Sequence, residues 1–153
     1  MVVLANEKYG FVMMIRKEWW SEFQRHNREG KQVQSYVNVG EAPPKNASKL
    51  FFYVVKPIGE LTAHAEFIER KAGDADEVWK EHGHESVLSS LQQYRSFLKN
   101  KRKVSFIRFK NLHEAGKPIP LNNLLMLLGL KRLSRRGFYV DKKTADRMIA
   151  LMK

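Results

Sequence analysis

Two apolar runs near the middle of the chain constrain its fold most strongly. Residues 49–55 (KLFFYVV) are rich in aromatic and β-branched side chains, which predicts a buried strand. Residues 56–60 (KPIGE) then turn the chain, and residues 61–68 (LTAHAEFI) alternate well enough to form the next strand. Two consecutive strands are therefore expected here, and the rest of the chain must pack around them.

Further strands and helices are expected on both sides of this pair. The other expected strands are residues 10–15, 32–37, 104–109 and 137–140. The expected helices are residues 16–28, a short helix after the N-cap Asp74, and residues 87–100, 121–128 and 142–152. The expected loops and turns are residues 41–48, 82–86 and 117–120. Short strands mixed with helices, without regular βαβ alternation, indicate an α+β fold around a small barrel, in a single domain spanning residues 1–153.

The absence of cysteine restricts both the chemistry and the compartment. Without cysteine the chain has no disulfides, zinc thiolate sites or cysteine nucleophiles, and it fits a reducing cytoplasm. No apolar run approaches the ~20 residues that a membrane span needs. Residues 1–10 also lack the apolar segment and cleavage site of a secretory signal. We therefore expect a cytoplasmic domain without a membrane partner.

The net charge of +12 is concentrated in the C-terminal part of the chain. Residues 1–91 hold 12 Lys and Arg against 13 acids, whereas residues 92–153 hold 16 Lys and Arg against three acids. This imbalance favours a nucleic acid as partner, because basic side chains release counterions from a polyanion. A charge-rich surface without a ligand and an anionic membrane surface are the alternatives. The residues expected to contact phosphates are Lys101, Arg102, Lys103, Arg108, Arg132, Arg135 and Arg136.

Two adjacent tryptophans lie on the first expected helix. Trp19 and Trp20 cannot both face one core, so at least one of them is expected at a boundary or in a cleft. In a cleft it would stack on an unpaired or flipped base. The alternative is one tryptophan in the core and one partly covered on the surface.

Three further residues are candidates for acid–base chemistry. Lys31 can bind a phosphate or act as a general base if it is desolvated, and otherwise it is a solvated lysine of a turn. His64 and Glu66 project from one face of a strand, which lines a cleft or is simply exposed to solvent. His82 and His84 suggest a metal, but no third ligand has a suitable spacing. We therefore expect no metal and no cofactor.

The order of these segments resembles the PUA-like superfamily and, within it, the ASCH-type domains. The likeness spans residues 11 to about 140 as a pattern. It is carried by Arg28-Glu29-Gly30-Lys31, by the strand pair of residues 49–68, by Glu77-Val78-Trp79-Lys80 before a helix with Tyr94, and by residues 104–109 followed by Pro118-Ile119-Pro120-Leu121.

This resemblance implies a compact pseudo-barrel of five to six strands with flanking helices. It also implies a cleft beside the first helix, which such domains often use for RNA or modified bases. Some proteins that resemble this chain are amidohydrolases acting on acetylated cytidine, and others are ribonucleases. In the amidohydrolase pattern a Thr and an acid follow the Gly-Lys closely, whereas Lys31 is followed here by QVQS. The resemblance therefore does not carry the hydrolase activity over.

The sequence thus favours a nucleic-acid-binding domain, with RNA preferred over DNA. One base would lie in a cleft near Trp19, Trp20, Lys31 and His64. The alternative is a hydrolase of the same fold, acting on a modified nucleoside or on single-stranded RNA, with Lys31, His64 and Glu66 as its groups. A protein-interaction module that uses residues 121–128 is a third class, although this apolar run is more typical of a buried core.

Overall fold

The computed structural model describes residues 7–153, which form one six-stranded mixed sheet and five α-helices. Residues 1–6, part of the segment in which we expect no secretory signal, lie outside the described residues. The strands are β1 (Gly10–Ile15), β2 (Val33–Val39), β3 (Lys49–Val54), β4 (Glu60–Asp74), β5 (Lys103–Pro120) and β6 (Phe138–Val140). The helices are α2 (Lys17–Arg28), α3 (Ala75–His82), the 3-10 turn η1 (Gly83–Glu85), α4 (Leu91–Leu98), α5 (Leu121–Leu128) and α6 (Lys142–Met152). No helix in residues 7–153 is both long and apolar enough to cross a membrane.

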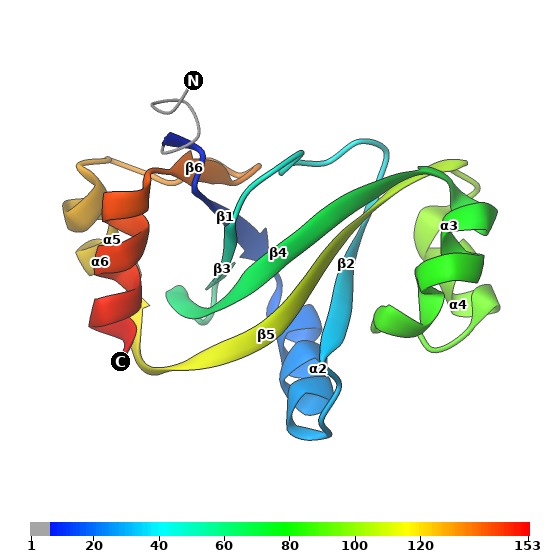
Figure 1. The fold of residues 1–153 in the computed structure, drawn as a ribbon, viewed down its shortest axis with the longest axis horizontal. Helices are drawn as coiled ribbons and strands as arrows, with labels where there is room; N and C mark the ends of the chain where they lie inside the picture. Colours follow the sequence, from blue (N-terminus) through cyan, green and yellow to red (C-terminus); the bar gives the residue numbers. More distant parts are fainter. Residues whose placement is uncertain (1–6) are drawn as a thin grey trace.

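The strands follow the order β2-β5-β4-β3-β1-β6. Strands β1 and β3 pair in parallel, and all other neighbours are antiparallel. The long strands β4 and β5 pair from Glu60 opposite Pro120 to Asp74 opposite Lys103, and their register shifts in three places. Figure 1 shows them as a curved ribbon with α5 and α6 at one end of the molecule and α3 and α4 at the other. This ribbon keeps the two pairs of helices apart.

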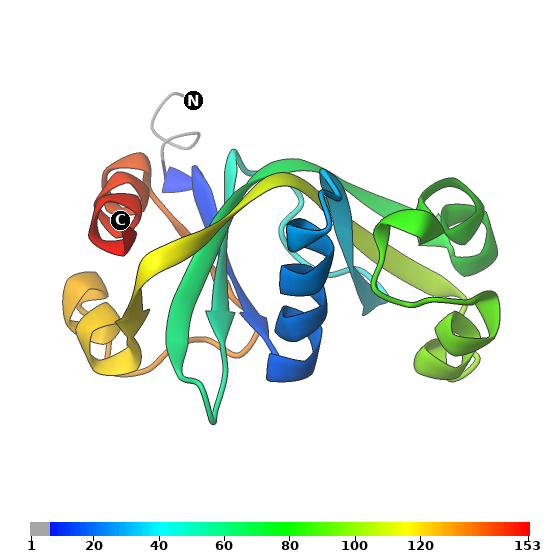
Figure 2. The ribbon, with the colours of Figure 1, turned by 90° about the horizontal axis from the view of Figure 1, so that it is seen from below.

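Helix α2 packs against the sheet through one aromatic face, as its sequence predicts. Trp20 and Phe23 are three residues apart and therefore lie on the same side of the helix. Both are buried, and Phe23 meets Phe52 and Phe109 with ring centroids 6.2 and 5.3 Å apart. Figure 2 shows α2 beneath the arch of β4 and β5, with β2 beside it. Burial of these rings fixes α2 on this face of the sheet.

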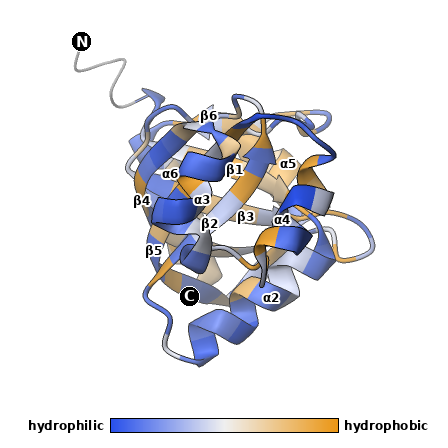
Figure 3. Cartoon of the chain, turned by 90° about the vertical axis from the view of Figure 1, so that its right-hand side faces the viewer, coloured by the Kyte–Doolittle hydropathy of each residue, from blue (hydrophilic) through white to orange (hydrophobic). Residues whose placement is uncertain are grey.

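The end helices pack against the sheet in two further apolar clusters. At one end, Leu124 of α5 and Met148 of α6 pack with Val12 and Phe51 of the strands. At the other end, Tyr94 of α4 lies among residues of α3 and β5. Hydrophobic residues gather on the central strands in Figure 3, while α2 is largely hydrophilic on its outside. The core is thus continuous with the sheet, and the helices cover it from both ends.

Much of the expected secondary structure is confirmed, including the α+β class and the helices over residues 16–28, 121–128 and 142–152. The capping role of Asp74 is also confirmed, because its carboxylate accepts the backbone N–H of Glu77 at 3.3 Å. The helix expected over residues 87–100 begins only after Ser90, whose side chain accepts the backbone N–H of Gln93. Upstream, the hydroxyl of Ser86 accepts the N–H of Leu88, and this local bond competes with helix formation.

The turn expected over residues 117–120 is wrong, because these residues end strand β5. Ile119 is buried opposite Leu61 of β4. Strand β2 pairs with β5 only as far as Lys110, so the end of β5 has a free edge. Proline lacks a backbone N–H and is tolerated on such an edge, which explains how Pro118 and Pro120 fit into a strand. Strands β4 and β5 are therefore much longer than their apolar patterns indicate.

Candidate nucleic-acid interface

A cleft of about 350 Å³ lies between β1 and β2, and we call it the β1–β2 cleft. The two strands stand at or next to opposite edges of the sheet, so the cleft depends on the sheet's curvature. Its lining consists of Phe11, Met13 and Met14 from β1, Tyr36 and Asn38 from β2, residues 41–43, and Arg135 and Arg136. Arg135 and Arg136, two of the residues expected to contact phosphates, therefore line the same cleft as aromatic side chains of the sheet.

Aromatic rings and guanidinium groups form different parts of this cleft. Phe11 is buried and packs edge-on against Tyr139, with ring centroids 4.9 Å apart. Tyr36 is half-buried, and its burial raises the pKa of its hydroxyl, which stays protonated at neutral pH. Arg135 and Arg136 are exposed and form no ion pair within residues 7–153. Glu41 is the single acid of the lining, so the cleft carries a positive net charge.

The loop that carries the two arginines is held tightly against β1. Gly137 at its end has a φ of +84°, and its N–H donates to the carbonyl of Ser134 at 3.2 Å. A Cβ at Gly137 would lie 2.5 Å from the Val12 carbonyl oxygen and 2.7 Å from the Phe11 ring. Only glycine permits this approach of the loop to the strand. The position of the two guanidinium groups thus depends on a glycine contact with the cleft wall.

Apart from Arg108, the predicted phosphate contacts fall into two separate patches. The α5 patch comprises the predicted contacts Arg132, Arg135 and Arg136 together with Lys131, on the loop between α5 and β6. The α4 patch comprises Lys101, Arg102 and Lys103, at the other end of the β4–β5 ribbon, where α4 leads into β5 (Figure 1). Of the 16 Lys and Arg in residues 92–153, only Arg95, Arg108 and Lys142 form ion pairs within the described part of the chain. The remaining cations are open to an anionic partner.

Arg108 differs from the other residues expected to contact phosphates, because it already forms ion pairs with acidic side chains of the protein. Its guanidinium lies 2.8 Å from Glu85 and 2.5 Å from Glu69, and its side chain is 16% exposed. The hydrogen bond to Glu85 raises the pKa of Arg108. A phosphate contact would require these ion pairs to break.

The two tryptophans do not line the β1–β2 cleft. Trp20 is buried over Phe52, with ring centroids 6.0 Å apart, and half-buried Trp19 packs edge-on against Phe97 at 5.6 Å. The aromatic residues of the cleft are Phe11 and Tyr36, which sequence reasoning missed. Each lies within an alternating or apolar strand pattern that looks like ordinary core.

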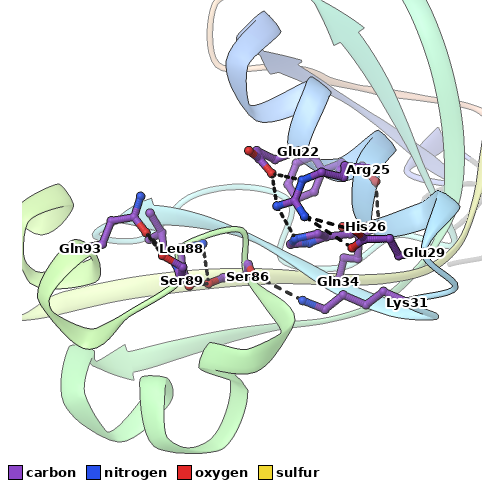
Figure 4. A network of polar contacts seen from close by, with 11 residues as sticks. Glu22, Arg25, His26, Glu29, Lys31, Gln34, Ser86, Leu88, Ser89 and Gln93 are labelled. Carbon is purple, nitrogen blue, oxygen red and sulfur yellow. Dashed lines mark hydrogen bonds and ion pairs between the residues drawn. The ribbon is translucent and has the colours of Figure 1, made fainter.

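Lys31 extends from the start of β2 toward the segment after η1. Its Nζ lies 3.5 Å from the Ser86 carbonyl oxygen, as Figure 4 shows. Burial lowers the pKa of Lys31, and the negative charge of Glu85 opposes this shift. Lys31 also lines a hollow of about 370 Å³ together with Asn111 and His113. A partly desolvated amine of this kind is a candidate general base.

His64 points away from the face that α2 covers. Its neighbours Ala63 and Ala65 pack with Trp20 on that face, and successive strand residues point to opposite faces. The His64 ring stacks on His113, with centroids 5.1 Å apart, and its Nδ1 is buried without a hydrogen-bond partner. Burial, followed by the charges of His113 and Lys49, lowers the pKa of His64 to about 4. The structure therefore does not bring His64 together with Trp20.

The three predicted catalytic groups are also not in mutual contact. Glu66 is half-buried and accepts a hydrogen bond from Asn111, which lowers the pKa of its carboxyl. Lys31 instead shares its hollow with Asn111 and His113, the partners of Glu66 and His64. His82 lies against Glu85, with its Nδ1 3.4 Å from Oε2. Within residues 7–153, no three side chains of the metal-binding types converge.

Comparison with known proteins identifies the architecture, a curved mixed sheet flanked by helices, as that of ASCH-type domains. The crystal structure of ASCH from Zymomonas mobilis has a TM-score of 0.76 and 18% identity to this chain, with 96% of this chain and 98% of that chain covered. A tyrosine-to-phenylalanine mutant of that protein gives a TM-score of 0.74 and 19% identity over 94% of this chain and 99% of that chain.

The NMR structure of Rpa0253 from Rhodopseudomonas palustris is more distant, with a TM-score of 0.52 and 13% identity over 94% of this chain and 92% of that chain. No family model and no curated protein sequence matches the chain. The expected ASCH-type fold is confirmed by these structures, which at such identities speak for the fold alone.

Proposed function

We propose that this chain is a nucleic-acid-binding domain whose ligand is single-stranded RNA. One unpaired nucleotide would occupy the β1–β2 cleft, with its phosphates on the α5 patch. The proposal depends mainly on one observation: Arg135 and Arg136, which form no ion pair with any residue of 7–153, line a cleft together with Phe11 and Tyr36. A guanidinium group can donate two parallel hydrogen bonds to the oxygens of a phosphate, and nucleobases stack on aromatic side chains.

The shape of the site and the charge of the chain support RNA as the ligand. A cleft of about 350 Å³ suits one splayed-out base, and proteins recognise RNA sequences mainly through such unpaired bases. The α4 patch offers a second set of phosphate contacts for a longer strand. The resemblance to ASCH-type domains adds the preference for RNA over DNA.

The proposal is tested by fluorescence anisotropy with labelled single-stranded RNA, duplex RNA and duplex DNA. We expect the single strand to bind best and its affinity to fall steeply between about 50 and about 200 mM salt. The double substitution Arg135→Ala/Arg136→Ala should lower the affinity and reduce the salt slope by about 0.7 for each phosphate that the protein no longer neutralises. The matched control is Arg25→Ala, which removes an exposed arginine of α2 that is already paired with Glu22 and belongs to neither patch. Equal affinity of the double variant and the wild type would contradict the proposal.

A second candidate function is hydrolysis of a modified nucleoside or of single-stranded RNA. The observation in its favour is Lys31, whose pKa is lowered by burial and whose amine shares a hollow with His113. We expect an enzyme of this kind to turn over acetylated cytidine or RNA, and to lose this activity in Lys31→Ala. The variant Arg135→Ala/Arg136→Ala should keep the chemical step and lose only affinity.

A further inference from the structure

A second hollow lies next to the β1–β2 cleft, and we call it the α5 groove. It has a volume of about 300 Å³ and lies between α5, the ends of β1 and β3, and the loop of the α5 patch. Its apolar lining includes Met14, Tyr53, Leu121, Leu125 and Leu133. The charged groups of its lining are all cations, namely Lys131, Arg132 and Arg135.

The α5 groove and the β1–β2 cleft share a wall. Met14 and Arg135 line both of them, so one methionine and one arginine separate the two hollows. The arginine is exposed and has no ion-pair partner within residues 7–153. A free guanidinium between two concave sites is placed to bind a phosphate that connects ligands in both.

Helix α5 leaves much of its apolar surface uncovered, contrary to the expectation that residues 121–128 form buried core. Leu124 is its one fully buried side chain, whereas Leu121 and Leu125 are half-buried in the groove. Met126 is 84% exposed, and Leu130, just beyond the helix, is 44% exposed. Met126 and Leu130 lie outside the lining of the groove, whose concave apolar wall with Leu121 and Leu125 is typical of a ligand site. Its cationic rim indicates that the ligand has apolar faces and negative charge.

We infer that the α5 groove is a second nucleobase subsite and that Arg135 binds the phosphate between two successive nucleotides. This inference rests on the proposed function and narrows it, because the recognised unit becomes two adjacent unpaired nucleotides. The groove provides apolar contact and few hydrogen-bonding groups, so base size decides its preference. A purine buries more surface than a pyrimidine and therefore binds better.

A protein segment is the other occupant that an apolar groove with a basic rim could accept. The shared wall favours the nucleotide. A nucleic-acid strand that occupies the β1–β2 cleft and continues past Arg135 would enter the α5 groove directly. Two residues of the α5 patch, Lys131 and Arg132, line the groove on the far side of that wall. A strand passing that way would meet cations throughout.

The test compares short ligands by isothermal titration calorimetry. We use adenosine monophosphate and the dinucleotides ApA and UpU as probes. ApA should bind about tenfold tighter than adenosine monophosphate, and tighter than UpU, since its second base gains an apolar site. In Leu125→Glu, at a half-buried position on the groove wall, ApA should lose its advantage over adenosine monophosphate, because the second base no longer gains an apolar site.

Met126→Glu is the matched control, because it places the same charge on the same helix at a residue outside the groove lining. It should leave ApA binding unchanged. As a measurement that needs no variant, the methyl NMR signals of Leu125 and Leu133 should shift with ApA and stay in place with adenosine monophosphate.

Two negative results have different meanings. If adenosine monophosphate and RNA bind but ApA gains nothing and Leu125→Glu changes nothing, the subsite is overturned while the proposed function stands, and the groove is left for a protein segment. If neither the RNA nor any of the nucleotides binds, the proposed function fails, and the inference falls with it.

Discussion

Arg108 and Glu85 form a bidentate ion pair inside the protein. The Nε of Arg108 donates to Oε1 of Glu85 at 2.8 Å, and a terminal nitrogen donates to Oε2 at 2.9 Å. Ser35 of β2 donates to the same Oε1 at 2.8 Å. Burial alone raises the pKa of the Glu85 carboxyl, but the hydrogen bonds from Arg108 and Ser35 hold it below its ordinary value. One carboxylate of η1 thus ties the helical segment between β4 and β5 to two strands.

Removing the arginine from this pair should destabilise the protein strongly. Arg108→Met leaves the 5% exposed carboxylate of Glu85 without its charged partner, and we expect a loss of about 3–5 kcal/mol in the free energy of unfolding. Arg95→Ala, which breaks the exposed pair with Asp76, should cost less than about 1 kcal/mol. Urea denaturation measures both values. The double variant Arg108→Met/Glu85→Gln should recover part of the loss, and equal effects of the two single variants would contradict this account.

Acid should destabilise the protein through His64. The folded protein holds the pKa of His64 at about 4, whereas the unfolded chain binds this proton near its ordinary pKa of about 6.5. As the pH falls from about 6.5 to about 4, the unfolded state takes up a proton that the folded state refuses, so stability falls over this window. The full shift corresponds to about 3 kcal/mol, and we expect about half of it because the ring is only partly buried.

An NMR titration of the His64 ring and urea unfolding at stepped pH check this expectation. His64→Phe should flatten the profile between about pH 4 and about pH 6.5. In His113→Gln the neighbouring charge disappears, so the pKa of His64 should rise toward its ordinary value. A pKa of about 6.5 for His64 in the wild type would contradict this account and show that the stacked site is open to solvent.

The local patterns of the sequence predict most elements of the fold for physical reasons. The spacing of Trp20 and Phe23 places both on one helix face, and the carboxylate of Asp74 caps the helix that follows it. These signals come from residues close together in the chain. The lengths of β4 and β5 could not be predicted in this way, because pairing between the two long strands extends them beyond their apolar runs.

The candidate site could be predicted only in part, because it depends on the order of the strands. Arg135 and Arg136 are found by their charge, but Phe11 and Tyr36 meet them only through the sheet's curvature. The same limit applies to the basic residues: those that cluster in the C-terminal sequence are divided in space by the β4–β5 ribbon. The aromatic spacing of α2 predicts its buried face without revealing what that face meets.

The placement of the tryptophans makes a prediction for their fluorescence. Trp19, Trp20 and Trp79 pack on Phe97, Phe52 and Tyr94, respectively, and none of them lines the β1–β2 cleft. Saturating single-stranded RNA should therefore leave the tryptophan emission and its quenching by acrylamide almost unchanged. Free tryptophan mixed with the same RNA corrects for absorption by the bases. Strong quenching on binding would place a base against α2 or α3 instead of in the cleft.

Alanine at Gly137 should change both the stability of the protein and its affinity for RNA. Alanine at Gly30 is the matched control. Both have a left-handed φ, +84° and +90°, so alanine at either position meets the same backbone strain of about 1 kcal/mol. A Cβ at Gly30 would have no neighbour within 4 Å, whereas a Cβ at Gly137 collides with Val12 and Phe11. Relief of that collision requires the loop to move away from β1.

We therefore expect Gly30→Ala to be destabilised only by this backbone strain and to keep its affinity for RNA. Gly137→Ala should lose more stability and should also bind RNA more weakly, because Arg135 and Arg136 move with the loop. Urea denaturation and anisotropy on the same protein samples separate the two effects. If Gly137→Ala were destabilised but bound RNA as tightly as Gly30→Ala, the two arginines would not need their position at the cleft, and their phosphate contacts would have to lie elsewhere on the α5 patch.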